Sequence, residues 1–262
     1  MIAAGVRTEI LARLAEAERR EDVRIILAVE SGSRAWGFAS SNSDYDVRFI
    51  YCRRTPWYLT VDLETRRDVL EYGIVDDIDL NGWDLRKALR LLRKSNPTIV
   101  EWLQSPVEYL SRGSFRSTAL ELLDQVYFPD KGIYHYRSMA KTNYRGYLQA
   151  EQVPLKKYFY VLRPLLAARW VEAHGEAPPI EFGTLLSAIA HEKELLADIG
   201  VLLERKRSGA ELDLAPPIPR INRFIEAELE RLEGVNPDAS KRASAEPLNA
   251  LFQSVIAEPW EA

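Results

Sequence analysis

The amino-acid sequence predicts an α+β fold in which a small mixed β-sheet with helices is followed by an α-helical domain. Two patterns along the chain support this division. Between about residues 22 and 82, continuous or alternating apolar runs indicate β-strands. After residue 82, apolar residues recur at helical spacing instead. With 262 residues, 47% of them hydrophobic, the chain is long enough to bury a substantial core.

The first part of the chain is expected to contain one amphipathic helix and a set of strands. Charged residues interrupt the apolar positions of the N-terminal segment up to residue 22, which favours a surface helix over a signal peptide. One or two helical turns are expected after Gly32 and Ser33. The predicted strands are 23–30, 44–51, 57–63 and 68–80.

Capping residues mark where helices of the second part begin. Asp84 can cap a helix that ends near Lys94, and Asn96 followed by Pro97 is expected to open the next one. Pro164 is expected to kink the long helix that contains it. The remaining predicted helices are 115–127, 134–150, 154–175, 182–207, 217–232 and 246–257, with a loop at 208–220.

Composition and charge restrict the class of protein. Cys52 is the single cysteine, which excludes an intramolecular disulfide, and the three histidines are scattered, which disfavours a Cys/His zinc site. No stretch reaches about 18 apolar residues, so we expect a cytoplasmic protein that does not enter a membrane. The net charge is −4, but residues 131–175 carry eight Lys or Arg against two Glu. This basic segment suits an anionic ligand.

Two carboxylates at alternate strand positions form the centre of the candidate site. Asp44 and Asp46 are expected to point to the same side of their strand, where their charges repel unless a cation lies between them. Mg²⁺ meets this need, because it prefers oxygen ligands and is often bound together with substrate phosphates. Asp79, in the apolar "IDL" of 78–80, supplies the third carboxylate expected at a site with two metal ions. The simpler alternatives are a turn role for Asp44 and a helix cap for Asp79.

Other residues near these carboxylates suit phosphate groups. The turn at Gly32 and Ser33 offers backbone N–H groups and a hydroxyl, and glycine lets a phosphate come close. Arg48 shares the face of Asp44 and Asp46, so it is expected either to pair with a carboxylate or to reach a phosphate.

Three short motifs together resemble the signature of the DNA-polymerase-β nucleotidyltransferase superfamily. The signature hG[GS], Dh[DE]h and h[DE]h is matched by "SGS" at 31–33, "SDYDV" at 43–47 and "IDL" at 78–80, with the polar Ser31 as a minor departure. The longer string "GSRAWGFASSNSDYDVRFIY" resembles the YcgL-like branch, also called the RNA-repair-pathway DNA-polymerase-β family. Further segments that resemble this branch are 96–109, 134–148 and 156–170, so the likeness spans roughly residues 24–175.

The resemblance implies an enzyme with two domains. Residues 1–110 would form the nucleotidyltransferase catalytic domain, and 111–262 an α-helical domain that completes the cleft for nucleotide and acceptor. The reaction would move a nucleoside monophosphate from an NTP such as ATP to a hydroxyl, with release of pyrophosphate and with two Mg²⁺ or Mn²⁺ ions. Asp44 and Asp46 would bind both ions, and Asp79 would bind the ion next to the acceptor hydroxyl and help to deprotonate it.

The resemblance also implies a set of phosphate-binding residues. The triphosphate would be held by residues in or next to the first two motifs, namely Gly32, Ser33, Arg34 and Ser43. A Lys or Arg of the helical domain would join them, and the candidates, without a choice among them, are Lys141, Lys156 and Arg163. Tyrosines share the helical faces of these cations, which suits the bases and phosphates of a nucleotide, although exposed cations on helices are usually only solvated.

Three functions are compatible with the sequence. The first is an enzyme that adds nucleotides to an RNA 3′ end in RNA repair. The second is a nucleotidyltransferase that modifies a partner protein, as an adenylylating antitoxin would. The third is a non-catalytic nucleotide sensor, which the complete set of three aspartates disfavours.

Overall fold

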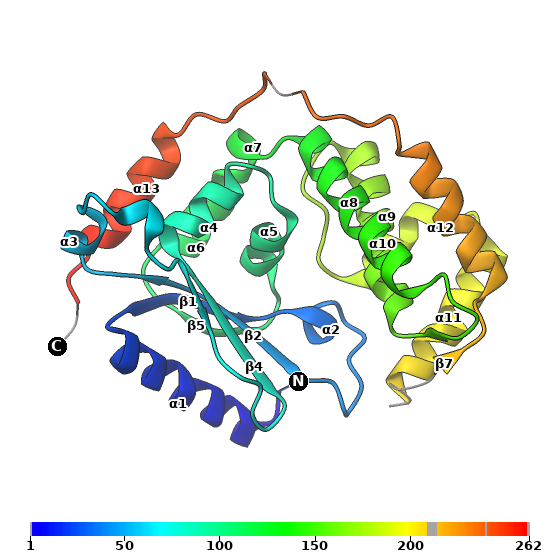
Figure 1. Ribbon diagram of the computed structural model, residues 1–262, viewed down its shortest axis with the longest axis horizontal. Coiled ribbons are helices and arrows are strands. Elements are labelled where there is room, and N and C mark those ends of the chain that lie inside the picture. Colours follow the sequence, from blue (N-terminus) through cyan, green and yellow to red (C-terminus); the bar gives the residue numbers. More distant parts are fainter. Residues whose placement is uncertain (1, 209–213, 239, 261–262) are drawn as a thin grey trace.

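A mixed sheet of five strands lies at the centre of the computed structural model, which describes residues 2–208, 214–238 and 240–260 (Figure 1). Its spatial order is β3-β4-β2-β1-β5. β1 pairs antiparallel with β2 and β5, β2 pairs parallel with β4, and β3 pairs antiparallel with β4. The predicted α+β fold with a mixed sheet is confirmed. The strands are β1 (Arg24–Glu30), β2 (Tyr45–Cys52), β3 (Val69–Glu71), β4 (Ile78–Asp84) and β5 (Glu108–Ser111).

Helices cover both faces of this sheet (Figure 1). On one face, Ile10 and Leu14 of α1 (Ala4–Glu21) share a core with Phe49 of β2. On the other face, Ile50 of β2 shares a core with Val126 of the short helix 123–126 and with four longer helices, one of which contains Leu89. Successive side chains of a strand point to opposite faces, so β2 contributes to both cores. The four helices are α4 (Leu85–Leu92), α5 (Pro97–Gln104), α6 (Phe115–Glu121) and α13 (Glu246–Ala257).

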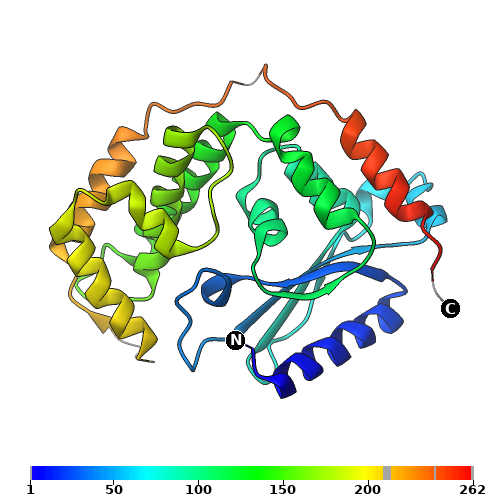
Figure 2. The ribbon, with the colours of Figure 1, turned by 180° about the vertical axis from the view of Figure 1, so that it is seen from behind.

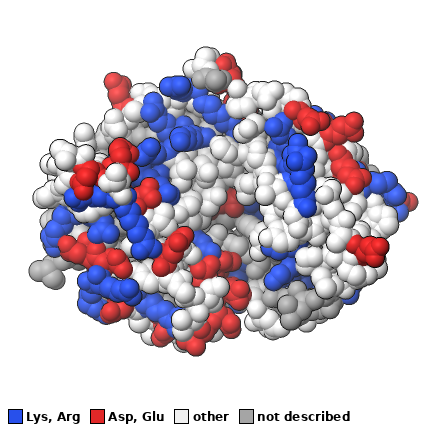
Figure 3. Space-filling view, in the orientation of Figure 1, with Lys and Arg blue, Asp and Glu red and all other residues white. Residues whose placement is uncertain are grey.

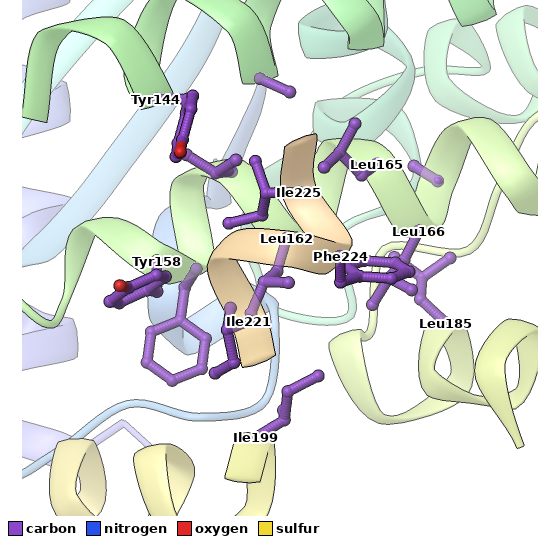
Figure 4. Close-up of a cluster of buried hydrophobic side chains, with 14 of the residues drawn as sticks. Tyr144, Tyr158, Leu162, Leu165, Leu166, Leu185, Ile199, Ile221, Phe224 and Ile225 are labelled. Atoms are coloured by element: carbon purple, nitrogen blue, oxygen red, sulfur yellow. The ribbon is translucent and has the colours of Figure 1, made fainter. Parts of the chain in front are cut away.

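A second group of helices lies beside the sheet (Figures 1 and 2). Its core contains Leu162 and Leu165 of α9 together with Ile199, Ile221 and Ile225 of neighbouring helices (Figure 4). Because α9 is enclosed on nearly all sides, its apolar residues surround it instead of forming one stripe. Even so, every helix in the described ranges, α9 included, is too short or too polar to span a lipid bilayer. The group consists of α8 (Pro129–Tyr147), α9 (Lys157–His174), α10 (Phe182–Leu185), α11 (Lys193–Arg207) and α12 (Pro219–Arg231).

The predicted helix caps are confirmed. The Asp84 carboxylate accepts a hydrogen bond from the backbone N–H of Arg86 at 2.8 Å, and Asn96 Oδ1 accepts one from Thr98 at 3.0 Å. These caps satisfy N–H groups that have no partner within the helix. The remaining short elements are α2 (Gly32–Ala35), α3 (Thr55–Tyr58), α7 (Leu123–Val126), two 3₁₀ turns (Leu63–Thr65 and Leu186–Ile189) and a small ladder of β6 (Val153–Pro154) with β7 (Leu214–Ala215).

Several predicted boundaries are wrong. No strand forms at 57–63, where α3 ends and a 3₁₀ turn follows, since Pro56 favours the first turn of a helix. The strand predicted at 68–80 is two antiparallel strands, because Asp76 and Asp77 adopt positive φ angles of 51° and 60° in the reversal between them. The helices predicted at 115–127 and 182–207 are each interrupted, whereas β5 was not predicted at all. Part of the loop predicted at 208–220 lies outside the described residues.

The hydrophobic cores do not follow the predicted domain boundary after residue 110. Helices α6 and α13 follow that residue, yet they pack on the sheet with α4. The separate helical core begins with α8 and ends with α12. Residues 232–238 and 240–245 lie between α12 and α13, at the top of the molecule (Figures 1 and 2). The domain boundary itself stays a prediction.

Candidate active site

Asp46 and Asp79 lie side by side at one end of two neighbouring strands. They are register partners in the parallel pairing of β2 with β4, each at the second position of its strand. Register partners point to the same face of a sheet, so the pairing brings together two carboxylates that are far apart in the sequence. Both are partly accessible, with 29% and 20% of their side-chain surface exposed.

The guanidinium of Arg48 bridges these two carboxylates. Its Nη2 donates to Asp46 Oδ1 at 2.8 Å and to Asp79 Oδ2 at 2.7 Å. Asn81 Nδ2 donates to the other oxygen of Asp79 at 2.8 Å. Burial raises the pKa of Asp46, and Arg48 opposes that rise, while Asp79 and Asp44 add to it by repulsion. Arg48 was expected either to pair with a carboxylate or to reach a phosphate, and in the structure it pairs with two carboxylates.

Gly32 is shaped to accept the Asp46 carboxylate. Its φ angle of 60° is one that side-chain-bearing residues rarely adopt, and a Cβ atom there would lie 2.0 Å from Asp46 Oδ2. The backbone N–H of Ser31 donates to the carbonyl oxygen of Asp46 at 2.9 Å, which fixes the end of β1 against the start of β2. Position 32 therefore needs a glycine to make room for the Asp46 carboxylate, whether or not a phosphate also binds there.

The loop before β2 places Asp44 next to this pair. Asp44 is exposed and precedes the first residue of β2, so the strand predicted at 44–51 begins one residue later. Arg34 holds the loop, because it donates to the carbonyl oxygens of Ser43 at 2.5 Å and Asp44 at 3.1 Å and lies 3.9 Å from the ring centroid of Tyr45. The buried hydroxyl of Ser43 accepts from the backbone N–H of Ser40 at 3.0 Å. Arg34 and Ser43 thus shape the loop, and their contact with a triphosphate stays a prediction.

Glu30 is a residue of this site that the sequence motifs do not reveal. Its side chain is fully buried, and Oε1 accepts the backbone N–H of Asp46 at 2.9 Å. The Tyr109 hydroxyl donates to the other oxygen. Burial raises the pKa of Glu30 to about 7. Glu30 therefore holds the backbone of Asp46 in place from inside the protein. The sequence did contain one sign of this role, because Glu30 is a charged residue at the end of an apolar strand.

A small cavity connects the strand ends with the helical group. Its volume is about 60 Å³, and Asp44, Asp46 and Ser33 face Lys156 and Lys206 across it. Trp36 and Tyr160 also line it, with ring centroids 5.6 Å apart in an edge-to-face arrangement. Small-molecule sites are typically roughly 300–1,000 Å³, so a nucleotide has to extend beyond this cavity.

The structure separates the three helical cations that the sequence offered as phosphate ligands. Lys156 lines the cavity, whereas Lys141 lies on α8 with Nζ 3.6 Å from Glu233 Oε1. Arg163 is 2% exposed, and its Nη1 pairs with Glu101 Oε1 at 2.6 Å. Its guanidinium also lies 4.8 Å from the ring centroid of Trp36, so Arg163 supports the cavity wall from behind.

Lys206 was missed by the sequence analysis. It lies in the last turn of α11, far along the chain from the motifs, and its Nζ donates to Ser43 Oγ at 3.3 Å. Its basic neighbours Arg205 and Arg207 gave no signal, since cations in the last turn of a helix are common.

The carboxylates offer the right chemistry for a hard divalent cation, although they do not converge on one point. Across the described ranges, no group of three or more His, Cys, Asp or Glu is placed to hold a metal ion. Asp46 and Asp79 share Arg48 instead, and Asp44 is outside that pair. Carboxylate oxygens are the ligands that Mg²⁺ prefers, and one guanidinium does not neutralise three carboxylates. The donor set therefore fits Mg²⁺ or Mn²⁺, provided that Arg48 gives up its place between Asp46 and Asp79.

Comparisons with known proteins place the chain in a family. A family model described as the RNA repair pathway DNA polymerase beta family matches residues 6–254. The uncharacterized protein YcgL of Bacillus subtilis (strain 168) is 44% identical over 258 residues, which cover 98% of each chain. A crystal structure of a nucleotidyltransferase-like protein from Exiguobacterium sibiricum 255-15 is 14% identical, with 95% of this chain and 75% of that chain covered. Its TM-score of 0.32 is too low to bear on the fold.

Proposed function

The chain belongs to the RNA repair pathway DNA polymerase beta family, and on this premise we propose that it transfers a nucleoside monophosphate from an NTP to the 3′ hydroxyl of RNA, with release of pyrophosphate. The observation that carries the proposal is the register pairing of Asp46 with Asp79, next to Asp44 and the close approach of Gly32. Paired carboxylates beside a glycine turn suit a reaction that depends on positioning and on charge stabilisation.

Asp44, Asp46 and Asp79 would hold two divalent metal ions. Such ions, when bound, lower the pKa of an attacking hydroxyl and neutralise charge on a departing phosphate. Arg48 holds the carboxylates of Asp46 and Asp79 close together before the ions bind. Glu30 fixes the backbone of Asp46, and the absence of a side chain at Gly32 leaves room for its carboxylate.

The chain's own cations and rings would hold the triphosphate and the base. Lys156 and Lys206 face Asp44 and Asp46 across the cavity, on the side where phosphates of the NTP would extend. Tyr160 is 40% exposed beside the same cavity and offers a ring face to a base. Ser33 supplies a hydroxyl and a backbone N–H at the start of α2.

A direct assay tests the reaction and the acceptor together. Wild-type protein is incubated with Mg²⁺, a 5′-labelled RNA 20-mer that ends in a 3′ hydroxyl, and each of the four α-labelled NTPs in turn. We expect extension of the RNA, and none of an RNA whose 3′ end is blocked by phosphate. The matched variant Asp79→Asn keeps the size of the side chain and is expected to extend the RNA at least 100-fold more slowly.

The outcomes separate the proposal from its alternatives. No extension with any NTP contradicts the RNA acceptor, and label that enters a protein band identifies a protein acceptor instead. Equal extension by Asp79→Asn and wild type contradicts the assigned site. Binding of NTP without transfer to any acceptor supports a sensor.

A further inference from the structure

A second cavity, rich in cations, lies away from the candidate active site. Its volume is about 570 Å³, within the range of sites that bind small molecules or parts of larger ones. It is formed by the end of α4, the start of α8 and, before α13, residues Pro237, Asp238, Arg242 and Ala243. We name it the basic cavity, after the residues Arg90, Arg93, Lys94, Lys131 and Arg242, which face the single acid Asp238 in its lining.

The basic cavity is held together by specific contacts. Arg93 Nε donates to the carbonyl oxygen of Ala243 at 2.9 Å, and Lys131 Nζ donates to that of Lys241. On the same side, the N–H of Asp238 donates to Asp130 Oδ2 at 2.8 Å. These contacts fasten Asp238, Lys241 and Ala243 to the end of α4 and the start of α8, and they fix Arg93 and Lys131 in position.

The cations of the basic cavity outnumber the acids beside them, since Arg90 pairs with Glu64 at 3.3 Å and Asp238 is the one acid in the lining. Within the described residues, Lys94 and Arg242 make no ion pair, and both are exposed. The Asp238 carboxylate accepts hydrogen bonds from the N–H of Ser240 at 2.9 Å and from its hydroxyl at 2.6 Å, and it contributes one negative charge against five cations. Like charges held this close repel one another, so an anion of several negative charges would relieve the repulsion.

Aromatic rings accompany these cations. Tyr134 is 36% exposed at the cavity, and His135 lies next to it with ring centroids 6.2 Å apart. Burial lowers the pKa of His135, which keeps its ring neutral near pH 7. Cations that meet phosphates, beside rings that can stack on bases, are the combination that binds single-stranded nucleic acid.

α8 connects the basic cavity with the candidate active site. The helix begins at the cavity and ends at Tyr147, where Lys157 Nζ lies 4.1 Å from the Tyr147 ring and 4.8 Å from that of Tyr160. Its 19 residues correspond to about 28 Å. Figure 3 shows Lys and Arg side chains gathered above the central hollow, over α4 and α7, and along α8 on its right.

We propose that the basic cavity binds the phosphodiester backbone of single-stranded RNA, upstream of the 3′ end that enters the candidate active site. This rests on the proposed RNA acceptor. At roughly 3.4 Å per phosphate of a stacked strand, the length of α8 corresponds to about eight nucleotides. RNA shorter than this cannot contact both places at once, whereas longer RNA can.

The double variant Lys94→Ala/Arg242→Ala tests the proposal, with Arg67→Ala/Arg223→Ala as a control of equal charge change outside the basic cavity. Binding of 5′-fluorescein RNA, as a 20-mer and as a 6-mer, is measured by anisotropy at several salt concentrations without NTP or metal. Each phosphate contact on a single strand contributes about 0.7 to the slope of log K against log salt. Loss of two contacts is therefore expected to lower the slope by about 1.4, and 20-mer affinity by about 25-fold at 0.1 M salt.

The 6-mer and the control variant decide the result. We expect the double variant to weaken binding of the 20-mer more than that of the 6-mer, because only the 20-mer can contact both places, and the control variant to bind both RNAs as wild type does. Equal loss in the control, equal loss for the 6-mer, or no loss at all overturns the proposal. Wild type that binds no RNA also overturns it, and leaves an acidic protein surface as the partner of this charge. The binding assay measures no chemistry, so its result is independent of the extension assay. If the double variant loses 20-mer binding but wild type does not extend RNA, the proposed reaction is wrong and the basic cavity is not. If wild type extends RNA but the double variant binds the 20-mer as before, the basic cavity is wrong and the reaction is not.

Discussion

Arg48 and Arg163 both pair with carboxylates, but in opposite surroundings. Arg48 is 17% exposed and lies between two aspartates at the strand ends, with a third beside the same cavity. Arg163 is 2% exposed and pairs with one carboxylate, Glu101, which is 8% exposed. The first site keeps an excess of negative charge within reach of solvent, whereas the second is neutral and closed. This difference indicates which pair can exchange its cation for a ligand and which pair holds the fold together.

The largest expected effect on stability comes from removing one partner of the buried pair Arg163–Glu101. Arg163→Met leaves Glu101 buried without a cation, so we expect a loss of about 3–5 kcal/mol in the free energy of unfolding, measured with urea. Removing both charges in Arg163→Met/Glu101→Leu is expected to recover most of that loss. Arg48→Met should cost less, because water reaches Asp46 and Asp79. A larger loss for Arg48→Met than for Arg163→Met would contradict the comparison.

A third carboxylate, Asp84, extends the comparison to a buried acid held by neutral donors. The Tyr58 hydroxyl donates to it at 2.8 Å, and burial raises its pKa to about 6. Its contribution to stability is complete below the ordinary pKa of an aspartate and is lost as pH rises through 6. The free energy of unfolding of wild type, relative to Asp84→Asn, should therefore fall by up to about 3 kcal/mol between pH 4 and pH 7. A difference that does not change with pH would show that Asp84 is charged in the folded protein.

Substitution of Gly32 tests how tightly the open site is positioned. In Gly32→Ala the new Cβ would lie 2.0 Å from Asp46 Oδ2, so the carboxylate has to move. A displacement of about 1 Å can lower a rate by roughly 100-fold, and we expect that loss in NMP transfer. Gly200→Ala, inside α11 with no atom within 4 Å of the new Cβ, is the control. It should keep full activity and gain about 1 kcal/mol in stability, and equal loss in both variants would argue against a specific role for Gly32.

The smallest expected effect separates the helical cations. Lys156→Ala removes a charge from the cavity wall and should raise the KM for NTP about tenfold, as expected for the loss of one charge-assisted hydrogen bond. Lys141→Ala removes an equal charge beside Glu233 and should leave the KM as it is. Steady-state kinetics with RNA in excess measures both. If Lys141→Ala has the larger effect, the nucleotide lies along α8 and not in this cavity.

The sequence by itself determined the local features of this protein. Asp46 and Arg48 share a face because strand side chains alternate, and Asp84 and Asn96 begin helices because their side chains accept N–H groups of the next turn. Each of these depends on residues within a few positions. The motifs around Gly32, Asp44, Asp46 and Asp79 were recognisable for the same reason.

Only the tertiary structure decided which distant residues meet. The parallel pairing of β2 with β4 sets Asp79 beside Asp46, and no local pattern specifies that register. A helix presents cations on every side, so spacing could not tell that Lys156 faces the cavity, that Arg163 is buried, or that Lys206 joins from α11. β5 was missed for a related reason, since its strand identity comes from pairing with β1 more than from its own residues. Burial and pairing depend on the whole chain, and they determine which charges are available to a ligand.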